Sequence, residues 1–489
     1  MPPHPTLSDG SCLSPAQVQA LEHIENDFRA APELLQNIVR GMHKAMDLGL
    51  SKPDQTLAML PSYIVGSATG NEKGRCLALD LGGTNFRVCE VLLLGQPGRY
   101  TMQQKKFKIP HTLKIAPATQ LFSFIADGIH SFLEEFATPE ERQGASCSAI
   151  SLGFTFSFPV VQRALNYGEL LQWNKGFTNP GAVGKDVVGL LQDALHTRGI
   201  EVTVTALLND TVGALMACSY HYPNTVMGAI LGTGSNTAYM ERMSRITKFD
   251  PLAVTPGASA PKRQVCGEDE MVINMEWGAF DNEGNVIPYN RYDRMLDVNS
   301  TNPGCQMFEK RISGLYLGEI FRLAILDMVR LKLVFNGRIS CALETPYILD
   351  TSVISTIVDD ASPDFCEGTP VLEEKLGLQF TCAADRYIVR RVATLVAYRS
   401  ARFAGAALGA VVLRRDDRLA RSTSEEPLTL GIDGSLYEHF ITFRENMVQS
   451  FRETVGEDNM TKLRIVLTKD GSGVGAAVAA IMNREGKCL

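Results

Sequence analysis

Two short hairpins have the residue types and spacing that phosphate binding requires. Residues 77–88 (LALDLGGTNFRV) and 228–239 (GAILGTGSNTAY) each read as an apolar strand, a tight turn rich in Gly and Thr, and a second strand. Glycine lets the backbone approach a ligand closely and the hydroxyl adds a donor, so each turn can present N–H and O–H groups to phosphate oxygens. A strand follows each turn, whereas a helix follows the turn of a P-loop or a dinucleotide fingerprint. One such hairpin is equally an ordinary β-turn, but its duplication predicts two lobes that clamp one nucleotide.

Asp210 is the side chain best placed to move a proton. Residues 202–208 (VTVTALL) predict a strand that stops at Asn209 and Asp210, and residues 211–220 have helical composition. Ligands collect beyond the carboxyl ends of strands in open α/β sheets. A carboxylate there could accept the hydroxyl proton when a phosphoryl group moves to an alcohol. The same position also fits a helix N-cap, a common role for Asp.

A second group of residues suits a polyol. Residues 151–159 (SLGFTFSFP) and 172–177 (QWNKGF) combine aromatic rings with hydroxyl, amide and ammonium groups. A neutral sugar needs several fixed donors and acceptors, since a buried polar group left unpaired costs about 1 to 3 kcal/mol. Four side chains could supply the acceptors: Asn209, Asn236, Glu276 and Glu309. Taken singly, each is as readily a structural hydrogen bonder.

The amino-acid composition of the chain indicates which kinds of molecule it can bind and in which compartment it is expected. The 489-residue chain has a net charge of −7, with 45% hydrophobic and 21% charged residues, which is ordinary for a globular protein. It offers no basic field for nucleic acid or an anionic membrane, so small molecules are the expected partners. Its 11 cysteines include no CxxC pair, which predicts buried thiols in a reduced compartment. Residues 1–11 lack a hydrophobic signal core, and the apolar stretch 403–413 is shorter than the ~20 residues that span a bilayer. We therefore expect a cytoplasmic protein.

The elements that must position these residues alternate between helices and strands. Helical periodicity begins at Ser14-Pro15 and recurs from Pro117 to Phe136, and residues 148–154 predict a buried strand. Long helices are predicted over 306–335 and 385–413, with a final helix after residues 470–473 that should pack tightly. Residues 242–268 and 416–427 predict surface loops, and the lobe boundary is placed near residues 220–224.

The ordered set of motifs resembles one family, the ATP-dependent hexokinases and glucokinases of the eukaryotic, especially fungal, type. The resemblance runs from about Ser14 to Met482 and rests on residues 79–88 (LDLGGTNFRV), 152–159 (LGFTFSFP), 208–213 (LNDTVG), 231–236 (LGTGSN), 276–280 (EWGAF), 308–310 (FEK), 313–319 (SGLYLGE), 433–437 (DGSLY) and 470–473 (DGSG).

The resemblance implies a fold, an activity and ligands. The fold would be an α/β, two-lobed, actin-like (ribonuclease H-like) ATPase fold, with a small lobe at residues 13–222, a large lobe at 223–484 and the last helix packed back on the small lobe. The activity would be ATP-dependent phosphorylation of glucose and other hexoses at the 6-hydroxyl, the first step of glycolysis, giving hexose 6-phosphate and ADP. The ligands would be the hexose, ATP and Mg²⁺, and the protein would be a monomer or weak homodimer.

The resemblance also assigns roles to residues. Asp210 would be the general base, with Lys175 as a second catalytic residue. The sugar would contact Ser157, Phe158, Asn174, Lys175, Asn209, Asp210, Asn236, Glu276 and Glu309. The nucleotide would lie against Asp80, Leu81, Gly82, Gly83, Thr84, Asn85, Arg87, Thr233, Gly314, Thr351, Ser355 and Ser435. Mg²⁺ would be held mainly by ATP phosphates and water, with Asp80 reaching it through water and no direct protein ligand.

Two departures and two alternatives accompany this interpretation. Asn174 stands where the family usually has Thr, which bears on sugar affinity or selectivity, and Val358 stands where the family tends to carry Glu. Residues 345–351 (TPYILDT) look more like fungal glucokinases than broad hexokinases. A hexokinase-like protein that senses sugar without catalysis is the alternative; the presence of Asp210, Lys175 and both phosphate turns favours catalysis. A third interpretation, a generic actin-like ATPase, does not explain the polyol-binding character of residues 151–159 and 172–177.

Overall fold

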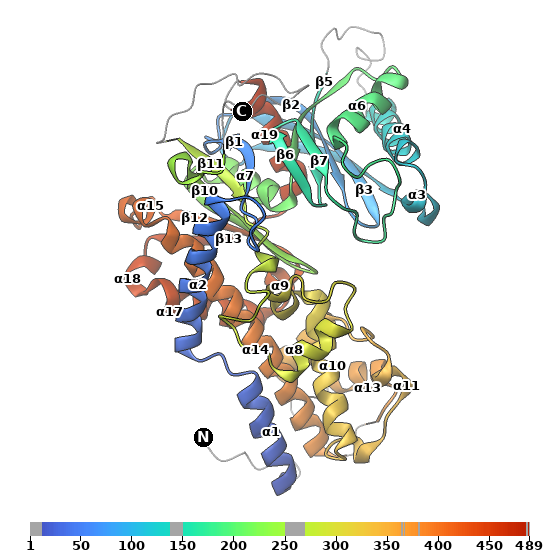
Figure 1. Ribbon diagram of the computed structural model, residues 1–489, viewed down its shortest axis with the longest axis vertical. Helices are drawn as coiled ribbons and strands as arrows, with labels where there is room; N and C mark the ends of the chain where they lie inside the picture. Colours follow the sequence, from blue (N-terminus) through green and yellow to red (C-terminus); the bar gives the residue numbers. More distant parts are fainter. Residues whose placement is uncertain are drawn as a thin grey trace.

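Two separate β-sheets form the framework of the protein (Figure 1). The computed structural model describes residues 12–136, 150–249, 269–362, 365, 367–379, 382–485 and 488. Figure 1 shows an elongated molecule, with the five-stranded sheet near one end and α1 near the other. The two predicted hairpins are confirmed as strands, and one lies in each sheet.

The first hairpin lies in the five-stranded sheet, whose order is β4-β3-β2-β5-β8. Its strands are β2 (Lys73–Leu81), β3 (Asn85–Leu94), β4 (Tyr100–Lys108), β5 (Ile150–Phe156) and β8 (Val202–Leu208). β2 pairs antiparallel with β3 and parallel with β5, and β5 pairs parallel with β8. The carboxyl ends of β2, β5 and β8 therefore meet at one edge, the place where ligands are expected.

The second hairpin lies in the six-stranded sheet, whose order is β1-β11-β10-β9-β12-β13. Its strands are β1 (Leu60–Val65), β9 (Thr225–Leu231), β10 (Ser235–Arg242), β11 (Glu270–Asn274), β12 (Leu428–Asp433) and β13 (Leu463–Leu467). β9 pairs antiparallel with β10 and parallel with β12. A small separate hairpin joins β6 (Val160–Ala164) to β7 (Tyr167–Leu170).

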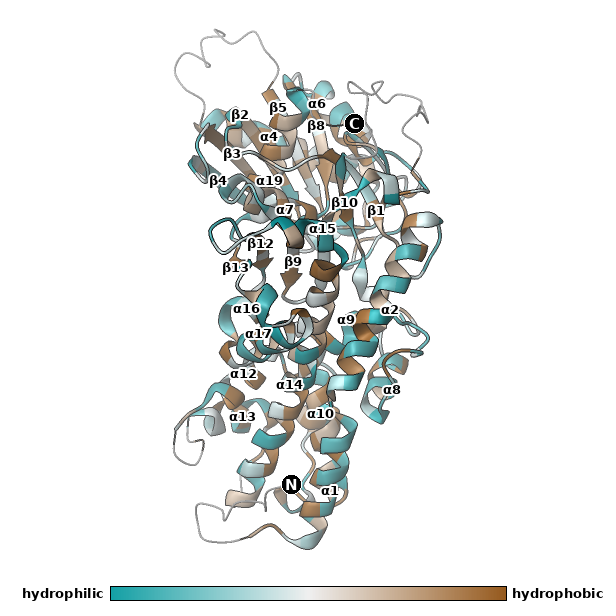
Figure 2. Ribbon diagram, turned by 90° about the vertical axis from the view of Figure 1, so that its left-hand side faces the viewer, coloured by the Kyte–Doolittle hydropathy of each residue, from teal (hydrophilic) through white to brown (hydrophobic). Residues whose placement is uncertain are grey.

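Helices cover both sheets and build the far end of the molecule. They are α1 (Pro15–Asp27), α2 (Pro32–Ser51), α3 (His111–Ile115), α4 (Ala118–Phe136), α6 (Val187–Thr197), α7 (Asp210–His221), α8 (Arg291–Val298), α9 (Met307–Ile312), α10 (Gly314–Arg330), α11 (Cys341–Glu344), α12 (Thr351–Asp359), α13 (Gly368–Leu376), α14 (Ala383–Arg414), α15 (Asp416–Arg421), α16 (Ser435–His439), α17 (Ile441–Val455), α18 (Glu457–Met460) and α19 (Gly471–Arg484). Single 3-10 turns are Met243–Arg245, Trp277–Ala279 and Phe335–Gly337. Figure 2 shows hydrophobic residues concentrated on the strands, while outer helices such as α1 mix hydrophobic and hydrophilic residues.

α7 and α19 occupy the space between the two sheets. α19 packs on α7, β2 and β5, and α7 also packs on β9. One buried cluster joins residues of both sheets, including Ala78 of β2 and Val272 of β11, to Leu215 of α7 and Ala477 of α19. The chain passes from one sheet to the other at residues 66–72, 222–224 and 468–470.

The first helices belong with the six-stranded sheet, which differs from the expected lobe range of residues 13–222. Leu21 of α1 and Met42 of α2 lie in the same buried cluster as Leu231 of β9, and β1 pairs with β11. The apolar faces of α1 and α2 therefore cover the second sheet, and the chain enters the first sheet only at Lys73.

Helix boundaries follow local chemistry in some places and tertiary contacts in others. Ser14 caps α1 in a capping box with Gln17, as the sequence signal predicts. The helix predicted over 306–335 is instead broken at Ser313, whose extended backbone separates α9 from α10. The loop predicted over 416–427 contains α15. By length and composition, α14 could cross a membrane. However, 94% of its most apolar 18-residue segment is buried inside the protein, as in the core helix of a globular protein.

Candidate active site

A cavity of about 530 Å³ lies where the ends of the two sheets face each other. The first lobe contributes Ser157, Phe158, Pro159, Asn174, Lys175, Asn209 and Asp210. The second lobe contributes Ile230, Gly232, Thr233, Gly234, Ser235, Asn236, Glu276, Gly278, Gln306, Glu309, Gly434 and Ser435. All nine residues predicted to contact the sugar therefore line one cavity, together with Thr233 and Ser435 from the predicted nucleotide set.

Asp210 stands at the carboxyl end of β8, as the first residue of α7. The helix cap is Asn209, whose Oδ1 accepts a hydrogen bond of 2.9 Å from the Thr211 amide N–H. Asp210 Oδ1 also accepts from that N–H, at 2.8 Å. Because Asn209 already caps the helix, the capping role considered for Asp210 does not explain its presence. Burial raises the pKa of the Asp210 carboxyl, while the charge of Lys175 opposes that rise.

An amide and carboxylate network holds the opposite wall. Asn236 Nδ2 donates to Asn274 Oδ1 at 2.8 Å and to Glu276 Oε1 at 3.2 Å. Asn274 Nδ2 donates to the same Glu276 oxygen at 2.8 Å. Burial raises the pKa of Glu276, and the two amide donors oppose this effect by stabilising its charged form. Glu276 therefore presents an ordered carboxylate to the cavity.

Glu309 completes this wall from α9. Its Oε1 accepts from the Ser235 amide N–H at 3.0 Å, and burial raises the pKa of the carboxyl to about 7. A Cβ at Gly234 would lie 2.8 Å from that oxygen, so the second phosphate turn can approach Glu309 only because residue 234 is glycine. A Cβ at Gly278 would likewise lie 2.2 Å from Gln306 Oε1.

An aromatic cluster fixes the loop that carries Asn174 and Lys175. The Trp173 ring lies 5.0 Å from that of Phe158 and 5.4 Å from that of Phe177, and Trp173 Nε1 donates to the Asn179 carbonyl at 3.0 Å. Lys175 Nζ donates to the Ser157 carbonyl at 2.7 Å and lies 5.2 Å from the centre of the Phe158 ring. Asn174 is exposed on the cavity wall.

The first phosphate hairpin lies beside this loop but outside the cavity wall. The Gly82 N–H donates to the Asn85 carbonyl at 3.1 Å and closes the turn. A Cβ at Gly83 would lie 3.2 Å from Lys175 Cβ. Thr84 is exposed at the tip, whereas the Leu81 side chain is buried in the core. Of the predicted nucleotide residues here, Leu81 can therefore offer only its backbone to a ligand.

The second phosphate hairpin gathers most of the remaining nucleotide residues. The Gly314 N–H donates to the Gly232 carbonyl at 2.8 Å, and Thr351 Oγ1 donates to the Gly314 carbonyl. These bonds explain the break between α9 and α10, because the start of α10 turns its N–H groups toward the hairpin. A Cβ at Gly232 would lie 3.5 Å from the Ser435 N atom. Ser355 follows Thr351 by one turn of α12 and is half-buried.

Comparisons with known proteins identify the family. The chain matches two family models described as hexokinase, one over residues 20–220 and the other over residues 226–482. It is 38% identical to a glucokinase of Aspergillus niger, over 96% of this chain and 98% of that one. It is 36% identical to hexokinase-1 of Schizosaccharomyces pombe, over 96% and 92% of the two chains. The chain belongs to the hexokinase family.

A solved structure supports the same fold. The hexokinase of Schistosoma mansoni, solved in complex with glucose, superposes with a TM-score of 0.80 at 34% identity and covers 95% of this chain and 99% of its own. A second hexokinase crystal structure gives a TM-score of 0.78 at 30% identity. The two-lobed actin-like fold expected from the motifs is thereby confirmed.

The hexokinase-family cavity includes residues that the sequence did not single out. Gln306 and Gly278 line it, and Asn274 orients Glu276 from behind the wall. Gln306 has a left-handed backbone (φ 55°) just before α9. The types of the neighbouring residues do not predict this conformation, so no signal in the sequence indicated its role. Val358, where the family tends to carry Glu, is buried in the core beside α10, so its role here is packing.

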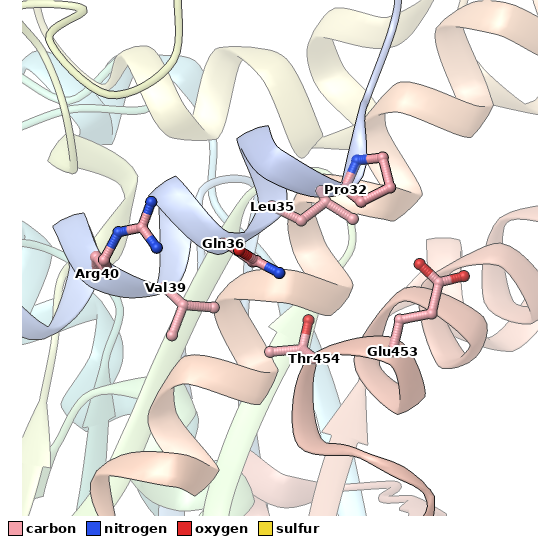
Figure 3. Close-up of a pocket in the computed structure, with 7 residues that line it drawn as sticks. All are labelled: Pro32, Leu35, Gln36, Val39, Arg40, Glu453 and Thr454. Atoms are coloured by element: carbon pink, nitrogen blue, oxygen red, sulfur yellow. The ribbon is translucent and has the colours of Figure 1, made fainter.

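A smaller cavity lies away from this site. It has a volume of about 260 Å³ and is formed by α2 and α17 (Figure 3). Its lining residues are Pro32, Leu35, Gln36, Val39, Arg40, Glu453 and Thr454. None of them belongs to the predicted sugar or nucleotide sets.

Proposed function

We infer that the protein transfers the γ-phosphoryl group of ATP to the 6-hydroxyl of glucose, giving glucose 6-phosphate and ADP. The observation that carries this inference is the placement of Asp210 in one cavity with the amide and carboxylate groups of Asn209, Asn236, Glu276 and Glu309. The phosphate turn at Gly232–Gly234 opens into the same cavity. A polyol and a triphosphate could thus meet beside one buried carboxylate. The family relationship supports the same reaction.

Asp210 would act as the general base. Its carboxylate would accept the proton of the 6-hydroxyl as the oxygen attacks phosphorus, while the amides and carboxylates of the cavity hold the remaining hydroxyls. Lys175 would keep Asp210 ionised, because its positive charge opposes the effect of burial on the pKa of that carboxyl. Holding the hydroxyl and the phosphate in one geometry is a large part of the rate enhancement expected for such a transfer.

Mg²⁺ would enter as part of the substrate, bound to ATP. In the part of the chain that the structure describes, no group of three or more His, Cys, Asp or Glu side chains could hold a metal ion. Mg²⁺ commonly keeps several waters and takes one or two carboxylates plus substrate phosphates, and the half-buried carboxylate of Asp80 at the first phosphate hairpin fits that requirement. When bound, the ion would neutralise charge on the β- and γ-phosphates. Asp80 would orient it through water.

The test is glucose-dependent release of ADP. Purified protein with ATP and Mg²⁺ should release ADP only when glucose is present, in amounts equal to the glucose 6-phosphate formed. Glucose binding without ADP release by folded protein would overturn the proposal and favour a sugar-sensing role. No contact described above favours that alternative.

We further propose glucose as the preferred hexose, in a cytoplasmic protein that is a monomer or weak homodimer. The glucokinase-like residues 345–351 support the preference, and the buried thiols of Cys76, Cys89 and Cys218 support the compartment. Parallel kinetics with glucose, fructose and mannose would test the preference. Sedimentation at several protein concentrations would test the assembly state.

A further inference from the structure

A polar cluster lies at the point where the C-terminal part of the chain passes from the second sheet to the first. β13 ends at Leu467 in the six-stranded sheet, and α19 begins at Gly471 and packs on β2 and β5 of the other sheet. Asp470, between them, has a left-handed backbone (φ 55°), which is uncommon for a residue other than glycine. The start of α19 is therefore held in a defined orientation beside the first phosphate hairpin.

Ser472 bridges two charged side chains of that hairpin. Its Oγ donates to Asp80 Oδ2 at 2.7 Å and accepts from Arg87 Nη2 at 2.9 Å. The direct approach of Arg87 Nη2 to Asp80 Oδ2 is longer, at 3.5 Å. The hydroxyl thus occupies the gap between the guanidinium and the carboxylate and fixes both.

Two further contacts fix Ser472 and Arg87. Arg87 Nη1 donates to Asp470 Oδ1 at 2.8 Å, so the guanidinium is held by both Asp470 and Ser472. Thr155 Oγ1, on β5, donates to the Ser472 carbonyl at 2.7 Å. The cluster therefore joins β2, β3 and β5 to the start of α19, and it includes the carboxylate of Asp80, which stands at the end of β2 beside the turn of the first phosphate hairpin.

We propose that Ser472 and Asp470 are positioning residues for the nucleotide half of the reaction. Ser472 orients the Asp80 carboxylate toward the hydrated Mg²⁺ of the incoming Mg-ATP, and Asp470 sets the guanidinium of Arg87 toward the phosphates. Neither residue lines the sugar cavity. This inference deepens the proposed function and rests on it.

The physical argument is one of orientation. A carboxylate that binds a metal ion through water must have its oxygens fixed, and groups behind a ligand that orient it typically contribute 10- to 100-fold to affinity or activity. Removing the Ser472 hydroxyl leaves Asp80 and Arg87 in place but lets both rotate. The loss therefore falls on Mg-ATP and spares the sugar, whose wall is built from other residues.

The experiment compares Ser472→Ala and Asp470→Asn with Ser450→Ala as a matched control. Ser450 Oγ, buried in α17, donates to the Arg402 carbonyl at 2.7 Å and lies outside the cavity and both hairpins. We expect Ser472→Ala to lower kcat/KM for Mg-ATP by about 10- to 100-fold. Its KM for glucose should stay within about twofold. Asp470→Asn keeps the side-chain shape and should change the same constants in the same direction. The control should affect stability only.

A binding measurement separates this proposal from the reaction itself. Calorimetric titration with a non-hydrolysable ATP analogue, with and without Mg²⁺, should show that Ser472→Ala weakens the Mg²⁺-dependent part of binding. Equal losses for glucose and nucleotide, or unchanged nucleotide binding in both variants, would make the cluster purely structural. If the wild-type protein released no ADP, the proposed function would fail while the titration still decided the role of Ser472. If Ser472→Ala did not fold, the same titration of Asp470→Asn would decide whether the cluster positions the nucleotide.

Discussion

At the scale of single residues, three carboxyl groups share the sugar cavity, and the structure gives them different surroundings. The positive charge of Lys175 acts on Asp210, Glu276 accepts hydrogen bonds from two amides, and Glu309 accepts one from a backbone N–H. Burial raises the pKa of all three. Only Asp210 has a lysine as the main influence that lowers its pKa, which makes it the carboxyl group best suited to be ionised before the reaction and so able to accept a proton.

Replacing Asp210 by Asn should therefore abolish the base and leave the fold. Asn209 caps α7, so the helix keeps its cap, and the amide retains an acceptor for the Thr211 N–H. Turnover should fall by about 10² to 10⁴, the usual contribution of a general base. Glucose affinity, followed by the fluorescence of Trp173 and Trp277, which are the chain neighbours of the cavity residues Asn174 and Glu276, should change little. Unchanged turnover would assign Asp210 a structural role.

Glu309 predicts a pH dependence of stability. Burial raises its pKa to about 7, above the ordinary value of 4.5, so the folded chain keeps a proton that the unfolded chain has lost across that range. Stability should therefore fall as pH rises from 4.5 to about 7, because the native state binds more protons there. Relative to the wild type, Glu309→Gln should become more stable on going from about pH 5 to about pH 8, by about 2.5 kcal/mol. Urea unfolding of the sugar-free proteins at both pH values measures this, and a difference independent of pH would contradict it.

Asn174 is the residue to examine for sugar selectivity. It lies on the cavity wall at the position where the family usually has Thr, and its amide offers a donor and an acceptor in place of one hydroxyl. Asn174→Thr should change KM or the preference between glucose and fructose by several-fold to tens-fold, equivalent to about 1 to 2 kcal/mol. The maximal rate should change less. Identical kinetics for every hexose would show that the side chain does not contact the sugar.

At the scale of elements, the close packing of α19 connects the two halves of the molecule. A Cβ at Gly475 would lie 2.0 Å from the Gly213 carbonyl oxygen of α7, and one at Gly153 of β5 would lie 2.2 Å from the Ala476 carbonyl oxygen. The tight packing predicted for the last helix is thus confirmed. Only glycine allows these backbones to approach so closely, and the approach brings the start of α19 to the phosphate hairpin.

Gly475→Ala should test this packing. Its added methyl meets backbone, which cannot move aside as a flexible side chain could, so the variant should lose about 1 to 3 kcal/mol of stability. Gly473→Ala, on the same helix, is the matched control, because its Cβ would lie 3.6 Å from the nearest atom, Cys89 Sγ. Denaturant unfolding of both variants makes the comparison. Equal stability of the two would show that α19 does not pack tightly on α7.

At the scale of the whole molecule, the two sheets are joined by short segments at residues 66–72, 222–224 and 468–470, and the cavity lies between them. Such an arrangement permits rotation of one sheet relative to the other. A phosphoryl-transfer site benefits from closure, because water would otherwise compete with the 6-hydroxyl for the phosphate.

Saturating glucose should therefore make the protein more compact. Small-angle scattering should give a smaller radius of gyration with glucose than without it, because a sugar bound in the cavity would contact both of its walls and draw them together. Sorbitol at the same concentration provides the contrast-matched control. An unchanged radius in the presence of saturating glucose would rule out closure driven by the sugar.

The sequence alone determined the features that depend on local pattern. Glycine and threonine between apolar strands predicted both phosphate hairpins, alternating periodicities predicted most helices and strands, and the ordered motifs predicted the family. The predictions of turns, helices and strands succeed because a tight turn or an amphipathic face is specified by a few neighbouring residues. The nine residues that the same motifs assigned to the sugar all line one cavity, although Gln306, which also lines it, was not among them.

Tertiary structure decided what depends on distant partners. The break at Ser313 follows from hydrogen bonds to the second phosphate hairpin, which lies 82 residues earlier in the chain. The Gly314 N–H donates to the Gly232 carbonyl at 2.8 Å, and the Leu315 N–H donates to the Thr233 carbonyl at 3.0 Å. The packing of α1 and α2 on the second sheet, the capping role of Asn209 and the bridge from Ser472 to Asp80 are of the same kind. No local pattern encodes such contacts, because their free energy is gained only when segments far apart in the chain are brought together by the fold.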